Sequence, residues 1–217
     1  MSILAKQIFF SHTWRNDKLN RNTHKRVLLL VAGLQRLGWG TWVDEEDMIG
    51  NIDACMALGI QNCECVLVCL TEEYCKKVND AANDLSIRDN CHKEWNYANI
   101  CSKLMIPIIM ENDLLDIKKW PLGVVPLHLG ACLYIDATKD DLGSAIMEIH
   151  NRLIRHQLFP KFIRKPILRK KSKSKRSVAN LWGISWKTKT DNKTQHKTQH
   201  KIKNLLPTRT FLCEIRV

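Results

Sequence analysis

Cys65-Val66-Leu67-Val68-Cys69-Leu70 is the stretch of sequence that decides the fold. Its six residues are all apolar, so a strand built from them must be covered on both faces. Strands of this kind belong to parallel sheets that carry helices on both sides. We therefore predict a strand over residues 64–70 in the interior of an α/β sheet.

Four more short apolar segments predict strands before and after this one. They are residues 6–11, with Ile8-Phe9-Phe10 at the centre, 39–43, 104–110 and 131–135. The segments between the five strands are helical or irregular, and that alternation favours a parallel sheet with right-handed crossovers. The sequence therefore predicts an α/β fold with a five-stranded parallel sheet flanked by helices.

Four of the segments outside the strands are predicted to be helices. Apolar residues recur at helical steps over 24–37, where Gly38 follows as a C-cap glycine would, and over 142–154. Residues 92–102 fit another helix. Asn51 or Asp53 is suited to cap a further helix of about ten residues. Residues 76–90 show no clear period, and residues 112–129 are predicted to be irregular because Pro121 and Pro126 interrupt them.

The charge divides the 217 residues into two parts. Residues 1–155 hold 17 Lys and Arg against 20 Asp and Glu, a net charge of −3, and residues 156–217 hold 17 against two, a net charge of +15. The second part is too poor in apolar residues to order itself. We predict a domain over 1–155 and a disordered basic C-terminal tail over 156–217. Its basic run at 164–176 is suited to nucleic acid, an anionic membrane or an import receptor.

The nine cysteines indicate reduced thiols rather than a metal centre. Several lie inside apolar runs, and the paired Cys-x-x-Cys spacing of a structural zinc site is missing, so we predict no metal. The first 20 residues show no signal-peptide core, and no apolar run approaches the ~20 residues of a membrane span. We expect a cytoplasmic protein, with the basic tail as a route to the nucleus.

Sites in open parallel sheets form outside the carboxyl ends of the strands. Three segments follow such ends, namely Ser11–Asp17, Asp44–Gly50 and Thr71–Glu94. We expect the functional residues among them.

The order of motifs resembles that of the Toll/interleukin-1 receptor (TIR) domain, a module of innate-immune receptors, plant resistance proteins and bacterial defence proteins. The resemblance covers roughly residues 5–155 and rests on the following motifs: Phe9-Phe10-Ser11-His12, Gly38-x-x-x-Trp42-x-Asp44, Gly50, Gly59-Ile60, the strand 66–71, Tyr74 and Cys91-x-x-Glu94. It implies a flavodoxin-like fold of five parallel strands.

The resemblance also implies one of two activities. Some TIR domains cleave the nicotinamide–ribose bond of NAD+, as hydrolases or as cyclases, and NAD+ is then a substrate rather than a cofactor. Others are non-catalytic adaptors that act through assembly with further TIR domains. Both readings stay open at this point, and they differ at Glu94, because pure adaptors often lack the glutamate.

Glu94 is the catalytic candidate that the resemblance implies. In TIR enzymes a glutamate on this helix contacts the ribose next to nicotinamide, where a carboxylate stabilises the positive charge that develops as the C–N bond stretches. Without the resemblance, Glu94 is an ordinary solvated glutamate on the rim of a helix. Many family members have Trp four residues before the glutamate, where this chain has Asn90, and we expect Trp95 to repack the edge of the pocket instead.

The two other loops supply the predicted NAD+-binding residues. Ser11, His12, Trp14 and Arg15 follow the first strand, where Arg15 is suited to a phosphate and Trp14 to stacking on a ring. Asp44 and Asp47 lie in the loop after the second strand, which in the family borders the site and takes part in assembly. If neither loop binds NAD+, residues 11–17 are an ordinary surface loop and residues 44–47 are a solvated acidic turn.

Response receivers and Rossmann dehydrogenases have related parallel sheets, but this sequence lacks a residue or motif that each of them needs. A response receiver needs a phosphate-accepting Asp at the end of the third strand, where this chain has Cys69-Leu70-Thr71-Glu72. A Rossmann dehydrogenase needs Gly-x-Gly-x-x-Gly after the first strand, where Ser11-His12-Thr13 stands.

Overall fold

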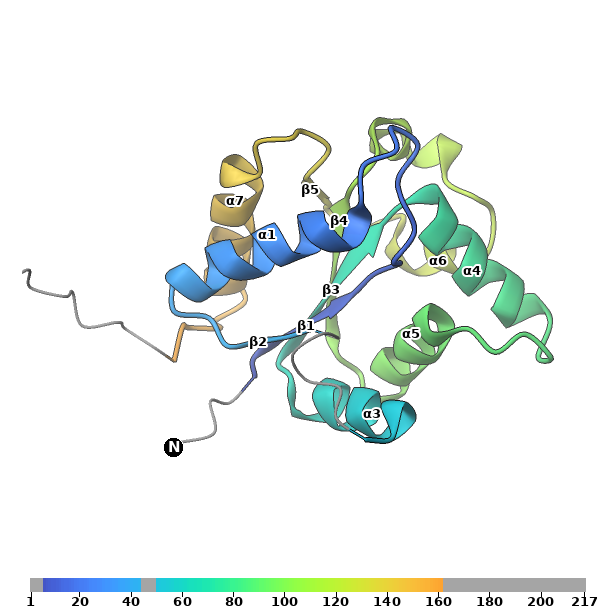
Figure 1. Cartoon of the computed structure of the whole chain (residues 1–217), viewed down its shortest axis with the longest axis horizontal. Helices are drawn as coiled ribbons and strands as arrows, with labels where there is room; N and C mark the ends of the chain where they lie inside the picture. Colours follow the sequence, from blue (N-terminus) through green and yellow to red (C-terminus); the bar gives the residue numbers. More distant parts are fainter. Residues whose placement is uncertain (1–5, 44–49, 162–217) are drawn as a thin grey trace, which may run out of the picture. The chain divides into compact units, whose positions relative to one another are not determined.

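A computed structural model describes residues 6–43 and 50–161 of the chain (Figure 1). Its sheet has five strands in the order β2-β1-β3-β4-β5, and every pair is parallel. The strands are β1 Ile8–Ser11, β2 Thr41–Trp42, β3 Cys65–Leu70, β4 Leu104–Ile109 and β5 Ile135–Asp136. The predicted flavodoxin-like parallel sheet is confirmed.

Strand β3 lies in the middle of the sheet, as its apolar sequence predicts. All six of its residues are buried, and it pairs with β1 on one side and β4 on the other. Ile8 and Leu104 both lie opposite Cys65, so the three central strands begin at one level. Their carboxyl ends therefore lie together at the opposite end of the sheet, where the site is expected.

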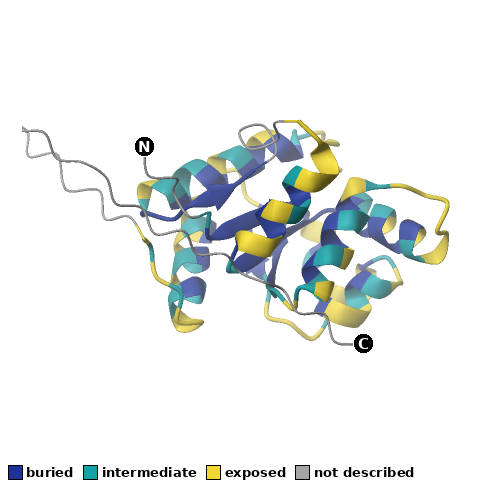
Figure 2. Cartoon of the chain, turned by 90° about the horizontal axis from the view of Figure 1, so that it is seen from below, coloured by how far each residue is buried: buried dark blue, intermediate teal, exposed yellow. Residues whose placement is uncertain are grey.

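Helices cover both faces of the sheet (Figures 1 and 2). Helices α1 and α7 lie on one face and α3, α4, α5 and α6 on the other, as the two apolar clusters of the core show. The helices are α1 Thr23–Arg36, α3 Ile52–Asn62, α4 Glu72–Asn83, α5 Asn90–Ile100, α6 Val124–Leu129 and α7 Gly143–Arg155, with 3-10 turns at Asn112–Leu115 and Ile117–Lys119. Figure 2 shows the buried strands between them.

Side chains capable of capping set where the helices begin. Asn51, rather than Asp53, caps α3 by accepting from Ala54 N, and Thr71 caps α4 by accepting from Tyr74 N. At the other end of α1, Gly38 has a φ of +92°, the left-handed conformation that a C-cap glycine adopts.

Three elements differ from the prediction. Helix α4 reaches into the stretch that showed no clear period, and α6 lies in the stretch predicted to be irregular. Pro126 is the third residue of α6, within the first turn, where no intrahelical N–H bond is lost. Strand β5 begins at Ile135 rather than at 131, because residues 129–132 close a turn in which Cys132 N donates to Leu129 O.

The predicted tail lies outside the described residues from 162 onward, but its first six residues are described. Gln7 Nε2 donates to Phe159 O at 2.8 Å, and Leu158 packs on the α1/α7 side of the core. The folded body therefore extends beyond Arg155, at least to Phe159. None of the helices in the two described ranges is long and apolar enough to cross a membrane.

Candidate functional site

Three buried polar side chains meet at the carboxyl end of β1. Ser11 Oγ, on the last residue of that strand, donates to Glu94 Oε2 at 2.7 Å and lies 2.8 Å from the Tyr74 hydroxyl. Ser11 is 1% exposed, Tyr74 0% and Glu94 4%, so none of the three is a solvated surface group. Buried polar groups need such partners, which makes this a specific arrangement rather than a chance contact.

The local sequence explains how these side chains come together. Thr71 follows β3 directly and caps α4, which places Tyr74 in the first turn beside the end of β1. Asp89 caps α5 by accepting from Cys91 N at 2.8 Å and from His92 N at 3.3 Å. Glu94 is then one turn further on, on the face of α5 that packs toward β1.

A cavity of about 450 Å³ opens beside Glu94. It is lined by residues 12–15, residues 88–91, Ile52, Lys77 and Glu94. Three of these residues, Arg15, Lys77 and Arg88, are cations. Lys77 Nζ pairs with Asp89 Oδ2 at 3.1 Å, whereas no carboxylate within residues 6–43 and 50–161 forms an ion pair with Arg15 or Arg88. The cavity is therefore suited to a ligand that carries negative charge.

The loop after β1 is stiffened by stacked rings. His12 Nε2 and His24 Nδ1 lie 2.7 Å apart, and the Trp14 ring stacks on His24 with 4.0 Å between the ring centroids. His12 is buried, whereas Trp14 is 54% exposed at the cavity. These contacts hold the backbone that carries Arg15.

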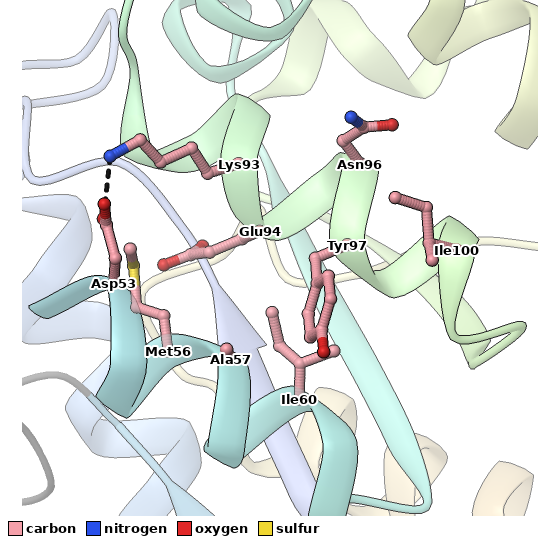
Figure 3. Close-up of a pocket in the computed structure, with 9 residues that line it drawn as sticks. All are labelled: Asp53, Met56, Ala57, Ile60, Lys93, Glu94, Asn96, Tyr97 and Ile100. Atoms are coloured by element: carbon pink, nitrogen blue, oxygen red, sulfur yellow. Dashed lines mark hydrogen bonds and ion pairs between the residues drawn. The ribbon is translucent and has the colours of Figure 1, made fainter. Parts of the chain in front are cut away.

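A second cavity of about 280 Å³ lies between α3 and α5 (Figure 3). Its walls are mainly apolar, with Met56 and Ile60 from α3 and Tyr97 and Ile100 from α5. Lys93 Nζ donates to Asp53 Oδ1 at 2.7 Å between the two helices. Glu94 lines this cavity as well as the first, so its carboxylate lies at the boundary between them.

The structure places the predicted site residues as follows. Ser11 is buried against Glu94, while His12, Trp14 and Arg15 line the charged cavity. Asp44 and Asp47 lie outside the described residues. Glu94 itself is buried and hydrogen-bonded, unlike the solvated helix glutamate that was the alternative to a catalytic role.

Trp95 does not repack the pocket edge as expected. It is 5% exposed, packs edge-to-face on His128, and lines neither cavity. The residues that sequence reasoning missed are Lys77 and Arg88. Both lie in the Thr71–Glu94 segment that was singled out, but without α4 in the prediction nothing indicated which of its side chains face the site.

The Cys91 thiol is the sulfur group nearest to the candidate catalytic residue in sequence. Cys91 lines the charged cavity, but burial raises the pKa of its thiol well above the ordinary value, so it stays protonated and is a poor nucleophile. Across the described ranges, no group of three or more His, Cys, Asp or Glu side chains is arranged to hold a metal ion.

Comparison with known proteins decides the family. The family model of the TIR domain matches residues 8–150, about two thirds of the chain. The chain belongs to the TIR domain family.

Two solved structures that resemble this TIR domain have low sequence identity to it. The TIR domain of the Toll-related receptor TRR-2 from Hydra magnipapillata is 21% identical, with a TM-score of 0.46, over 68% of this chain and 97% of that one. The Clostridium botulinum CMP N-glycosidase BcmB is 16% identical, with a TM-score of 0.42, over 68% of this chain and 100% of that one. No curated protein matches the sequence.

Proposed function

We propose that this TIR domain cleaves the nicotinamide–ribose bond of NAD+. The observation that carries the proposal is the position of Glu94: a carboxylate hydrogen-bonded to Ser11 at the edge of a cavity lined by three cations. The carboxylate matches the charge that develops on the ribose, and the cations match the pyrophosphate that the ribose carries.

The chemistry assigns Glu94 an electrostatic role. As the C–N bond stretches, positive charge moves from the pyridinium ring to the ribose, and the transition state resembles an oxocarbenium ion. A carboxylate held beside the ribose stabilises that charge without having to reorganise. Nicotinamide leaves as a neutral molecule, so a general acid is not required, and water adds at the ribose carbon to give ADP-ribose, nicotinamide and a proton.

Arg15, Lys77 and Arg88 fit the pyrophosphate. Arg15 and Arg88 present guanidinium groups to the charged cavity, where bidentate contacts with phosphate oxygens are favourable. The predicted ligand residues His12, Trp14 and Arg15 line the same cavity, which supports their assignment to NAD+. Ser11 contributes through Glu94, because its hydroxyl is directed there.

The second candidate function is assembly without catalysis. TIR domains commonly interact with other TIR domains, and self-association is also a common requirement for TIR enzymes to complete their sites. Exposed apolar side chains on α3 and α5, namely Ile52, Leu58 and Ile100, favour such an interface on this side of the molecule.

Incubation of the purified chain with NAD+ separates the two functions. Nicotinamide release, followed by liquid chromatography over a wide range of protein concentrations and with a crowding agent, is the expected result for the enzyme. If no nicotinamide is released at any concentration while the chain self-associates, the enzyme proposal fails and the adaptor function takes its place.

A further inference from the structure

Tyr74 is a buried polar side chain that the proposed chemistry does not yet use. It is 0% exposed and packs in the cluster between the sheet and helices α3 to α6. A phenylalanine would pack equally well there, so the hydroxyl group needs a reason of its own. That hydroxyl lies 2.8 Å from Ser11 Oγ.

The direction of the hydrogen bonds follows from the number of donors. An ionised carboxylate only accepts, so the bond between Ser11 and Glu94 uses the single proton of the Ser11 hydroxyl. Ser11 Oγ then has no proton left for Tyr74, and the Tyr74 hydroxyl must be the donor. The chain of bonds runs in one direction, from Tyr74 through Ser11 to Glu94.

Secondary structure fixes the first two members of this hydrogen-bond chain. Ser11 ends β1, and Tyr74 is held one turn into α4 by the Thr71 cap, whose hydroxyl accepts from Tyr74 N at 3.1 Å. Burial raises the pKa of the Tyr74 hydroxyl well above its ordinary value, so it keeps the proton that it donates. Successive hydrogen bonds in a low-dielectric interior also strengthen one another.

We propose that Tyr74 is a positioning residue that acts on Glu94 through Ser11. The Tyr74 hydroxyl donates to Ser11 Oγ, so the serine proton is directed toward Glu94 Oε2. The resulting hydrogen bond holds the carboxylate at the boundary of the two cavities. Tyr74 touches no ligand itself, since it lines neither cavity. The inference rests on the proposed NAD+ cleavage for its catalytic consequence, but not for the hydrogen-bond chain.

A double-mutant cycle tests whether Tyr74 works through Ser11. Tyr74→Phe removes one hydroxyl from the chain and is expected to lower kcat for nicotinamide release about five- to tenfold, with little change in KM. Ser11→Ala is expected to lower kcat by at least as much. Because the tyrosine acts only through the serine, adding Tyr74→Phe to Ser11→Ala should cause no further loss.

Tyr134→Phe is the matched control for the tyrosine. The Tyr134 hydroxyl donates to Leu115 O at 3.0 Å, away from both cavities, so its loss removes one hydrogen bond and should leave kcat unchanged. Thermal melting of each variant checks that it is folded. Losses in kcat that multiply in the double variant would overturn the inference, because they would show that Tyr74 acts independently of Ser11.

A second readout does not depend on turnover. The infrared difference between the unmutated protein and Glu94→Gln isolates the carboxylate stretching band of Glu94. Tyr74→Phe is expected to shift that band in the direction of the Ser11→Ala shift, and Tyr134→Phe to leave it in place. A protein that releases no nicotinamide but shows this shift refutes the proposed function alone, whereas an unshifted band in Tyr74→Phe overturns the inference.

Discussion

At the scale of single residues, burial distinguishes Glu94 from an ordinary helix-surface glutamate. A carboxylate that is 4% exposed loses most of its contact with water, and the Ser11 hydroxyl compensates part of that loss. The same burial raises the electrostatic effect of the carboxylate on a neighbouring charge. The Glu94 carboxylate is thus positioned to stabilise a positive charge, and the ribose gains such a charge in the transition state.

The cations of the first cavity should govern binding rather than the chemical step. Arg88→Gln is expected to raise KM for NAD+ about fivefold with little change in kcat, because an exposed guanidinium contributes the same phosphate contact before and during bond cleavage. The increase should shrink at high salt, which screens exposed charges.

Steady-state kinetics at low and high salt measure this effect. Arg155→Gln, at the end of α7 and outside both cavities, is the matched control and should leave KM unchanged. A fall in kcat at constant KM for Arg88→Gln would place the residue in the chemical step and contradict this assignment.

At the scale of elements, the sequence predicted the sheet well because its signals are local. The apolar run 65–70 suffices for a strand buried on both faces, and the parallel topology then brings the ends of β1 and β3 together. The sequence therefore predicted that the Ser11–Asp17 and Thr71–Glu94 segments meet at this end of the sheet, and Ser11 and Glu94 are in contact there. Helix α4 was missed although Thr71, with Glu72 and Glu73 after it, is a helix-start signal.

Helix α6 was missed because a side chain far away in sequence anchors it. Asn79 Nδ2 donates to Pro121 O at 3.0 Å and to Leu122 O at 3.2 Å, and Asn79 Oδ1 accepts from Val125 N at 3.1 Å. Gly123 has a φ of +149°, and a Cβ there would lie 2.3 Å from Asn79 Cγ, so only glycine allows this approach. No local pattern of residues 112–129 contains that information.

Asn79→Ala should therefore loosen α6 selectively. The loss of three hydrogen bonds from a buried side chain is expected to cost about 2 kcal/mol of unfolding free energy. Hydrogen exchange of the amides in Val124–Leu129 should become faster, while β3 stays protected. Asn83→Ala, an exposed position on the same helix α4, is the control, and equal exchange in both variants would show that Asn79 does not anchor α6.

At the scale of the whole molecule, the folded body should end near residue 161. Truncation after Lys161 is expected to leave the melting temperature unchanged, because the residues removed are mostly charged and polar. Truncation after Arg155 also removes the Phe159 carbonyl that Gln7 contacts and the Leu158 side chain, and should lower the melting temperature by about 2–6 °C.

Differential scanning fluorimetry of the two truncated chains makes the comparison. A drop of many degrees on truncation after Lys161 would mean that the basic tail is part of the folded core. An unchanged melting temperature for both would mean that residues 156–161 contribute nothing to stability.

The buried thiols should make the fold sensitive to alkali. Burial raises the pKa of Cys63 from its ordinary 9.0 to about 11 and that of Cys75 to about 12, and raises that of Cys69 further. Above pH 9 the unfolded chain releases thiol protons that the native state keeps, so the unfolding free energy falls as pH rises. The stabilising contribution is complete below pH 9 and is lost as pH rises through the folded values.

Urea denaturation under reducing conditions between pH 8 and 10.5 measures this slope. Cys69→Val removes one fully buried thiol and should make the slope shallower, whereas Cys132→Ser, at an exposed position, should leave it as it is. A slope that is the same in all three proteins would mean that the thiols do not carry the effect.

Nicotinamide release by Glu94→Gln tests the central claim most directly. Glutamine keeps the shape of the side chain and a hydrogen bond with Ser11 but removes the charge, so kcat should fall ~10²–10³-fold while the melting temperature and NAD+ binding change little. Glu148→Gln, on α7 on the opposite face of the sheet, is the control and should retain full activity. An unmutated protein that releases nicotinamide together with an equally active Glu94→Gln would contradict the account.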